Sequence, residues 1–197
     1  MSAAQAGEIP LFPLQTVLFP GGRLPLRIFE QRYMDMAKAC LRDGAPFGVC
    51  LIREGGEVGE PALPEDLGCT ARIVEWDMPQ LGLLQVVARG ERRFRIRRRR
   101  LQADGLALAE IQLLPAEADA TLDPQADLCA RVLHRIVDAA PAGLVESPPH
   151  YESGAWVSAR LAELLPLSPA SKQRLLEMDD ARDRIEILRR LISSSGQ

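Results

Sequence analysis

The sequence predicts an α+β protein, in which a small barrel of about six strands with one helix precedes a bundle of four helices. Residues 1–115 contain short alternating apolar segments that Gly, Pro and Asp residues interrupt. The last 75 or so residues instead repeat apolar residues at helical intervals, and an Ala- and acid-rich stretch separates the two parts. We therefore expect a barrel domain over residues 1–115, a linker over 116–124 and a helical domain over 125–197.

The front part contains segments with the alternation and turn boundaries that are typical of β-strands. These segments are residues 9–14, 24–29, 47–52, 70–78, 83–89, 93–101 and 106–114. An acidic loop is expected over residues 54–65, and Asp104-Gly105 is expected to close a hairpin. Prolines at positions 10, 13, 20 and 25 indicate edge strands. About six strands suit a closed or half-closed barrel.

One helix interrupts these strands. Residues 30–42 place Tyr33, Met34, Ala37 and Leu41 at helical spacing. Gly44 follows, and glycine is the residue that most often terminates a helix in the left-handed conformation. We expect the helix to end there.

The back part contains four helical segments. Asp123 is expected to cap the first, which runs to residue 140, and the second covers residues 151–165. Ser168, followed by proline, is expected to cap a short third helix, and Asp180 is expected to cap the last. Short connections between amphipathic helices favour a bundle.

Composition limits the function classes. The net charge is −3, with 15 basic and 14 acidic residues in 1–115 against 9 and 13 in 116–197. Neither part has the strongly basic balance of a domain that binds nucleic acid with its whole surface. The hydrophobic fraction of 47% and the charged fraction of 26% are those of an ordinary globular protein.

The cysteines predict neither a metal site nor a disulfide framework. Cys40, Cys50, Cys69 and Cys129 are scattered and form no C-x-x-C pair, so we expect reduced, buried thiols. No signal peptide and no apolar run of membrane-spanning length is present, which predicts a cytoplasmic protein without a membrane contact.

Several local strings occur in an order that resembles one known family. They are IPLFPL at 9–14, VLFPG at 17–21, LPLRIFE at 24–30, FGV at 47–49, GCTA at 68–71, GERRF at 90–94 and LPLS at 165–168. This chain is similar to the amino-terminal, substrate-binding domain of Lon proteases. The resemblance implies a PUA-like β-barrel followed by a helical bundle, and a function in binding unfolded or specific proteins and peptides.

The resemblance does not extend to the family's catalytic parts. No G-x-x-x-x-G-K-[ST] phosphate-binding string and no Ser-Lys peptidase element occurs within these 197 residues. We therefore expect no enzyme activity, no cofactor and no catalytic residue. The expected role is a stand-alone recognition module that acts as an adaptor or regulator in protein quality control.

Apolar side chains are the candidates for partner contact. Most are expected in the core, and a subset exposed where barrel meets bundle would form a binding groove. Exposed edge strands could also pair with a peptide backbone. The partner-binding candidates are Phe12, Phe19, Phe29, Tyr33, Trp76 and Met78.

An arginine run offers a second hypothesis. Alternation places Arg93, Arg95 and Arg97 on the face opposite Phe94, and the run continues through Arg99 to Arg100. A solvated face that pairs with acids such as Glu110 is the preferred interpretation, because charge runs are usually surface. The alternative is an RNA-binding PUA-like protein that uses this basic ribbon. Self-association is a third possibility for partner contact.

The remaining polar residues do not predict catalysis. His134 and His150 have no cluster of carboxylates around them, and Glu75 and Asp77 flank Trp76 as exposed strand residues do. We expect these side chains to be solvated.

Overall fold

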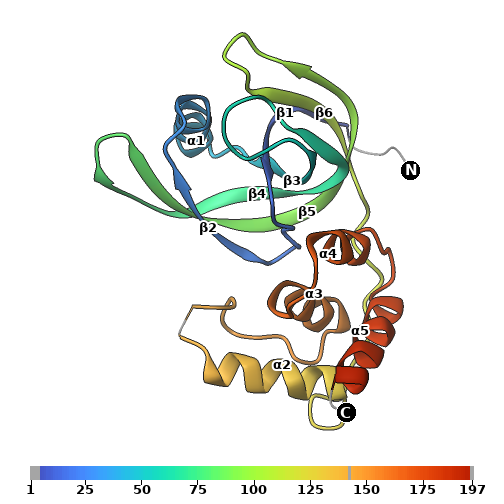
Figure 1. Cartoon of the computed structure of the whole chain (residues 1–197). Helices are drawn as coiled ribbons and strands as arrows, with labels where there is room; N and C mark the ends of the chain where they lie inside the picture. Colours follow the sequence, from blue (N-terminus) through green and yellow to red (C-terminus); the bar gives the residue numbers. More distant parts are fainter. Residues whose placement is uncertain (1–4, 142, 196–197) are drawn as a thin grey trace. The chain divides into compact units, whose positions relative to one another are not determined.

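The computed structural model describes residues 5–141 and 143–195, and its mixed α+β fold is drawn in Figure 1. The chain divides into two compact units, residues 1–115 and residues 116–197. Each unit is described by itself. The described part of the first contains six strands and one helix, and that of the second contains four helices.

The strands of the first unit form one sheet that closes on itself. The strand order is β2-β5-β4-β3-β1-β6, and an additional pairing joins β5 to β6. Five strands therefore form a closed ring, with β2 attached outside it along β5. Only β1 and β3 pair in parallel. The strands are β1 (Gln5–Leu14), β2 (Arg23–Ile28), β3 (Phe47–Glu54), β4 (Leu63–Gln80), β5 (Leu83–Leu101) and β6 (Ala107–Leu113).

Strand β5 corrects the prediction of two separate strands over 83–89 and 93–101. Its 19 residues continue through Gly90, whose missing side chain leaves room for the backbone carbonyl of Phe19. The first half pairs with β2, the second half pairs with β6, and β4 pairs along most of the length. Strand β4 also begins earlier than predicted, because Leu63 pairs with Glu54 inside the expected loop.

A small apolar core lies between β1, β3, β5 and β6. Phe94 is its largest member, and its side chain is fully buried. A side chain at Gly48 would place its Cβ 2.7 Å from the Phe94 ring, so the glycine makes the space that the ring occupies. The other members of this core are Ile9, Leu11, Cys50, Ala107, Ala109 and Ile111.

A larger apolar core includes one face of α1 (Gln31–Asp43). Tyr33, Met34, Met36 and Ala37 of the helix are buried there. The helix ends as predicted at Gly44, which takes the left-handed conformation with φ of 60°. The residues whose spacing predicted the helix include Tyr33, Met34 and Ala37, and these three side chains pack in this core.

The second unit contains α2 (Leu128–Ala139), α3 (Gly154–Leu164), α4 (Pro169–Leu176) and α5 (Ala181–Ser195). Helix α3 packs against the other three. Ser168 caps α4 as predicted, and the Asp180 carboxylate accepts from the Arg182 backbone N–H at the start of α5. None of the helices within the described residues is both long and apolar enough to cross a membrane.

The predicted cap of the first of these helices is wrong. Asp127, not Asp123, accepts from the backbone N–H groups of Cys129 and Ala130, at 2.9 and 3.1 Å. Asp123 instead closes a turn before the helix by accepting from Gln125 N at 2.9 Å. Helix α3 likewise begins after Ser153 rather than at residue 151.

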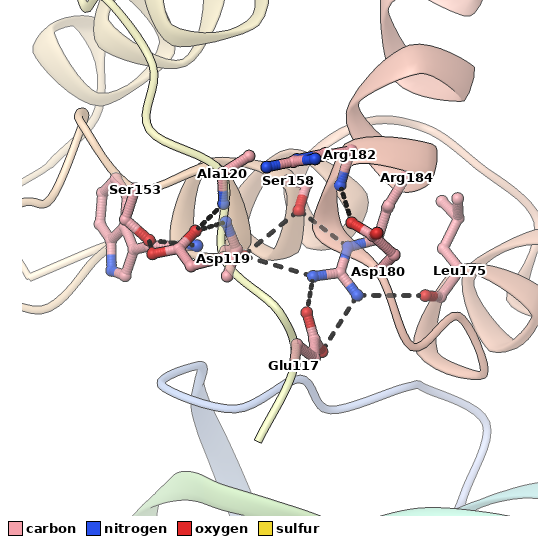
Figure 2. Close-up of polar contacts among 11 residues, drawn as sticks. Glu117, Asp119, Ala120, Ser153, Ser158, Leu175, Asp180, Arg182 and Arg184 are labelled. Carbon is pink, nitrogen blue, oxygen red and sulfur yellow. Dashed lines mark hydrogen bonds and ion pairs between the residues drawn. The ribbon is translucent and has the colours of Figure 1, made fainter. Parts of the chain in front are cut away.

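The segment expected as a linker is hydrogen-bonded to the helices of the second unit (Figure 2). The Ala120 carbonyl accepts from Gly154 N at 2.7 Å, and the Ala118 carbonyl accepts from Ala181 N at 3.3 Å. Glu117 forms an ion pair with Arg184 of α5. The segment before α2 is therefore fixed to both α3 and α5.

Candidate functional site

An apolar groove lies beside the edge strand β2. Its floor includes Phe12 and Tyr33, whose rings stack with centroids 4.2 Å apart and planes 17° apart. Residues 24–29 of β2 and its continuation line one side, and Glu57 and Val58 of the β3–β4 loop line the other. The groove encloses about 360 Å³, the size of a small ligand site.

Two large apolar side chains at the groove face solvent. Phe29 is 60% exposed and Val58 is 61% exposed, although both line the groove. Phe29 is exposed because it leaves β2 just after Ile28, which points into the core. Exposed apolar side chains beside a groove are typical of a surface that binds a partner.

Arg32 adjoins the groove without lining it. It is 7% exposed, donates to the carbonyls of Gly105 (3.1 Å) and Gly59 (2.9 Å), and pairs with Glu30 at 2.7 Å. Its guanidinium also lies over the Tyr33 ring, 4.8 Å from the centroid. This one side chain therefore links α1, the β3–β4 loop and the β5–β6 turn.

Charges near the groove act on Tyr33. Burial raises the pKa of the Tyr33 hydroxyl, the Arg32 charge opposes this rise, and Glu30 and Glu57 add to it. Glu57 and Tyr33 line the same groove.

A second concave surface of about 640 Å³ lies over β2, β5 and β4. Arg27, Glu75 and Asp77 line it with Pro25 and Val87, and Arg23 pairs with Glu75 at 2.6 Å. Apolar side chains, Trp76 among them, line this surface together with charged groups of both signs. The pair of carboxylates does not stand apart as a catalytic dyad, because Glu75 is neutralised by Arg23.

The β4–β5 hairpin carries further exposed apolar side chains. Strand β4 pairs with β3 only as far as Ala71, so the hairpin extends beyond the ring (Figure 1). Trp76 is 61% exposed, Met78 is 38% exposed and Leu81 at the tip is 96% exposed. These three residues are called the hairpin patch below.

The six predicted contact residues separate into two groups. Phe12, Phe19 and Tyr33 are buried, whereas Phe29, Trp76 and Met78 are exposed. Phe12 and Tyr33 still contribute to the groove floor, but Phe19 lines no part of it. Sequence reasoning missed Val58 and Leu81, which could have been found as apolar residues inside turns.

Two arginines of the run, Arg98 and Arg100, contact acids, which is the arrangement that the preferred interpretation expects. Arg100 donates to both carboxylate oxygens of Glu8, at 2.6 and 2.5 Å, and this contact holds the pKa of Glu8 below its usual range. Arg98 lies 4.0 Å from Glu110, and Arg97 donates to Gln112.

Arg93 is not part of an exposed patch. It is only 3% exposed, so the prediction that placed it on the outer face was wrong for this residue. Arg95 and Arg99 are exposed. A register shift between Ile96 and Arg98 also breaks the simple alternation of the run.

The described residues contain no group of three or more His, Cys, Asp or Glu side chains arranged to hold a metal. All four cysteines are buried and reduced, and burial raises the pKa of Cys129 to about 11. His134 pairs with Asp138 at 2.7 Å on the exposed side of α2. These arrangements supply no activated nucleophile.

Residues 8–194 match the family described as the ATP-dependent protease La (LON) substrate-binding domain. The chain belongs to this family. Among solved structures, a Lon N-terminal domain protein from Xanthomonas campestris is similar with a TM-score of 0.75 and 39% identity, over 93% of this chain and 97% of that one. The N-terminal domain of a Mycobacterium avium complex Lon protease shares the Lon-domain fold at a TM-score of 0.65 and 20% identity, over 92% and 95% of the two chains.

Curated relatives include both Lon proteases and a different protein. The Lon protease of Methylocella silvestris is 25% identical over 190 residues, which cover 90% of this chain and 22% of that protease. Protein cereblon of Xenopus tropicalis is 30% identical over 112 residues, which cover 55% of this chain and 24% of cereblon. The chain thus spans about a quarter of the length of these relatives. The family that it matches is a substrate-binding domain rather than a catalytic one.

Proposed function

We propose that this chain is a non-catalytic recognition module that binds extended, apolar segments of other proteins in the groove beside β2. The hairpin patch is the second contact surface. In this proposal the protein acts as an adaptor or regulator in protein quality control. The PUA-like barrel contains the groove. The four helices form a bundle that helps to present the bound segment to a partner.

The observation that carries the proposal is the exposure of Phe29 and Val58 at the groove. Covering an apolar side chain of this size contributes roughly 1.5–3 kcal/mol, so a bound apolar segment would gain from both. Membership of a substrate-binding family supports the same conclusion. Pro25 on β2 disfavours pairing with an added strand, so side-chain burial supplies most of the binding free energy.

The other parts of the proposal concern partners and location. The four buried, reduced cysteines support a cytoplasmic protein. The hairpin patch is also a surface through which two copies could associate, in competition with a substrate. RNA binding by Arg95, Arg97 and Arg99 is the alternative function, and the contacts of Arg98 and Arg100 with acids weigh against it.

The test is a binding titration by fluorescence anisotropy. The probe is fluorescein-labelled lactalbumin that has been reduced and carboxymethylated, so that it stays unfolded. Replacing Phe29 by Ser is expected to weaken binding at least about tenfold, since central apolar contacts carry most of the binding free energy.

The matched control is Ile187→Ser, because Ile187 is 41% exposed on α5 and lies outside the groove. The control should bind like the wild type. Equal affinity of the Phe29→Ser variant and the wild type would overturn the groove as the site. Binding of an RNA oligomer that weakens steeply with salt and is lost on replacing Arg95, Arg97 and Arg99 would favour the alternative.

A further inference from the structure

The loop that forms one side of the groove is attached to the rest of the unit by few contacts. Residues 55–62 connect β3 to β4, and residues 55–61 are all exposed. The loop is closed at its base, where Glu54 pairs with Leu63 and a Cβ on Gly55 would lie 3.2 Å from Ala62 Cα. A closed base with an exposed tip allows the loop to move as one piece.

Glycines give the loop its conformational freedom. Gly55 and Gly59 have φ angles of 96° and 89°, which other residues rarely adopt. No atom lies within 4 Å of the position that a Cβ on Gly59 would take. A side chain added at Gly59 would therefore point into open space.

Two hydrogen bonds hold the loop against the groove. Arg32 Nη2 donates to the Gly59 carbonyl at 2.9 Å, and Gln15 N donates to Glu57 Oε1 at 2.6 Å. Between these two attachment points lies Val58, which lines the groove. The two bonds therefore set the position of Val58 over the aromatic floor.

Arg32 itself is held from three other directions. Its contacts with Glu30, the Gly105 carbonyl and the Tyr33 ring lie outside the loop. Gly105 has φ of 84°, and a Cβ there would approach Arg32 Nη1 to 2.9 Å, so the turn makes room for the guanidinium. The guanidinium is thus a fixed point against which the loop closes.

We propose that residues 55–62 are a flap over the peptide groove, and that Arg32 and Glu57 are the positioning residues that hold it closed over a bound apolar segment. This inference rests on the proposed function. Two of the described hydrogen bonds, those of Gln15 and Arg32, would break on opening, whereas a segment bound beneath Val58 adds apolar contact to the closed form. Binding and closure therefore favour each other.

The first measurement uses the free protein and does not depend on binding. Backbone hydrogen exchange is followed by NMR at the Gln15 N–H, because this group donates to Glu57 Oε1 when the loop is closed. Glu57→Ala removes the bond from Gln15, and Glu60→Ala removes an exposed carboxylate from the same loop without touching that bond. Exchange should rise about two- to tenfold in Glu57→Ala, the effect of one hydrogen bond, and stay at the wild-type rate in Glu60→Ala.

The second measurement is the dissociation rate of the unfolded, fluorescein-labelled lactalbumin in stopped flow. Glu57→Ala should release the probe about two- to tenfold faster, in proportion to its exchange, and Glu60→Ala should match the wild type. Arg32→Met should show the largest increase, and Arg32→Lys, which keeps one donor group, should recover part of the loss. Circular dichroism establishes whether each variant is folded. If an Arg32 variant does not fold, the comparison of Glu57→Ala with Glu60→Ala decides the outcome.

Three results separate the two proposals. Equal exchange in Glu57→Ala and Glu60→Ala overturns the flap, whether or not the probe binds. Faster exchange with an unchanged dissociation rate shows that the loop moves without holding the segment, which also overturns it. If the probe does not bind to the wild type, the proposed function is overturned, and with it the role of the flap. The exchange data then still report on the hydrogen bond between Gln15 and Glu57.

Discussion

Arg184 of α5 and Glu117, which precedes α2, form a buried ion pair (Figure 2). The Arg184 side chain is fully buried, and that of Glu117 is 9% exposed. Arg184 also donates to Ser158 Oγ at 2.8 Å and to the Leu175 carbonyl at 3.4 Å. One guanidinium thereby joins α3, α4, α5 and the segment that leads into α2.

Removing one partner of this pair should be costly. Glu117→Gln leaves the Arg184 charge buried without its carboxylate, which is expected to lower the free energy of unfolding by about 3–5 kcal/mol. Urea denaturation followed by circular dichroism measures it. Glu186→Gln affects the exposed pair with Arg190 and should cost less than about 1 kcal/mol. Similar losses in both variants would contradict the structural role of Glu117.

The space around Phe94 should tolerate no added methyl group at Gly48. The new Cβ would lie 2.7 Å from the Phe94 ring and 2.8 Å from Leu11 Cδ2. Gly48→Ala is expected to cost about 1–3 kcal/mol through overpacking. Phe94→Leu in the same chain should recover part of this loss, because the clash is with a side chain. Gly7→Ala, where no atom lies within 4 Å, should change stability by less than about 0.5 kcal/mol. Thermal melting of the three variants and the wild type measures these effects.

Asp127 and Asp123 should differ in their importance for α2. Asp127 caps the helix and also pairs with Arg189 at 2.7 Å, whereas Asp123 only closes a turn. Asp127→Ala is therefore expected to cost about 1–2 kcal/mol, and Asp123→Ala clearly less. Chemical denaturation compares the two variants. A larger loss in Asp123→Ala would restore the prediction made from the sequence.

Asp119 should make the stability of the second unit depend on acid. Burial acts to raise the pKa of Asp119, but hydrogen bonds from Ala155 N and Ser153 Oγ outweigh it and hold the pKa below its ordinary value of 3.8. The folded state therefore favours the charged carboxylate. Its stabilisation is fully present above about pH 5 and is lost as the pH falls through 3.8 and below.

The comparison for this effect is Asp119→Asn, which keeps the shape and removes the charge. The wild type should be the more stable protein at pH 7, by at most about 1 kcal/mol because solvent screens the exposed carboxylate. The difference should shrink between pH 5 and pH 3 in urea titrations. A difference that stays constant with pH would assign the effect to hydrogen-bond geometry alone.

Local signals predicted local features well. Gly44, the Asp104-Gly105 turn and the Ser168 cap each depend on a few neighbouring residues, and the structure confirms all three. The two strands expected around Gly90 are one, because pairing with β2, β4 and β6 decides where a strand ends. A one-residue register shift likewise depends on the partner strand and cannot be inferred from alternation.

The candidate site could be predicted only in part. Among the candidate contact residues, Phe19 and Phe29 have the same residue type, yet Phe19 is completely buried and Phe29 is 60% exposed. That difference depends on where β2 ends and α1 begins. The burial of Arg93 could not be predicted either, because it depends on residues that are distant in the sequence and close in the fold.

The closure of the ring has a consequence for how the chain folds as it is synthesised. Strand β1 is made first, yet its partners are Gly48–Leu51 of β3 and residues 108–112 of β6. The first strand must therefore wait until residue 112 has emerged before both of its edges are covered. Such distant pairing is slow compared with helix formation. Until then, one edge of β1 is without the strand that covers it in the folded unit.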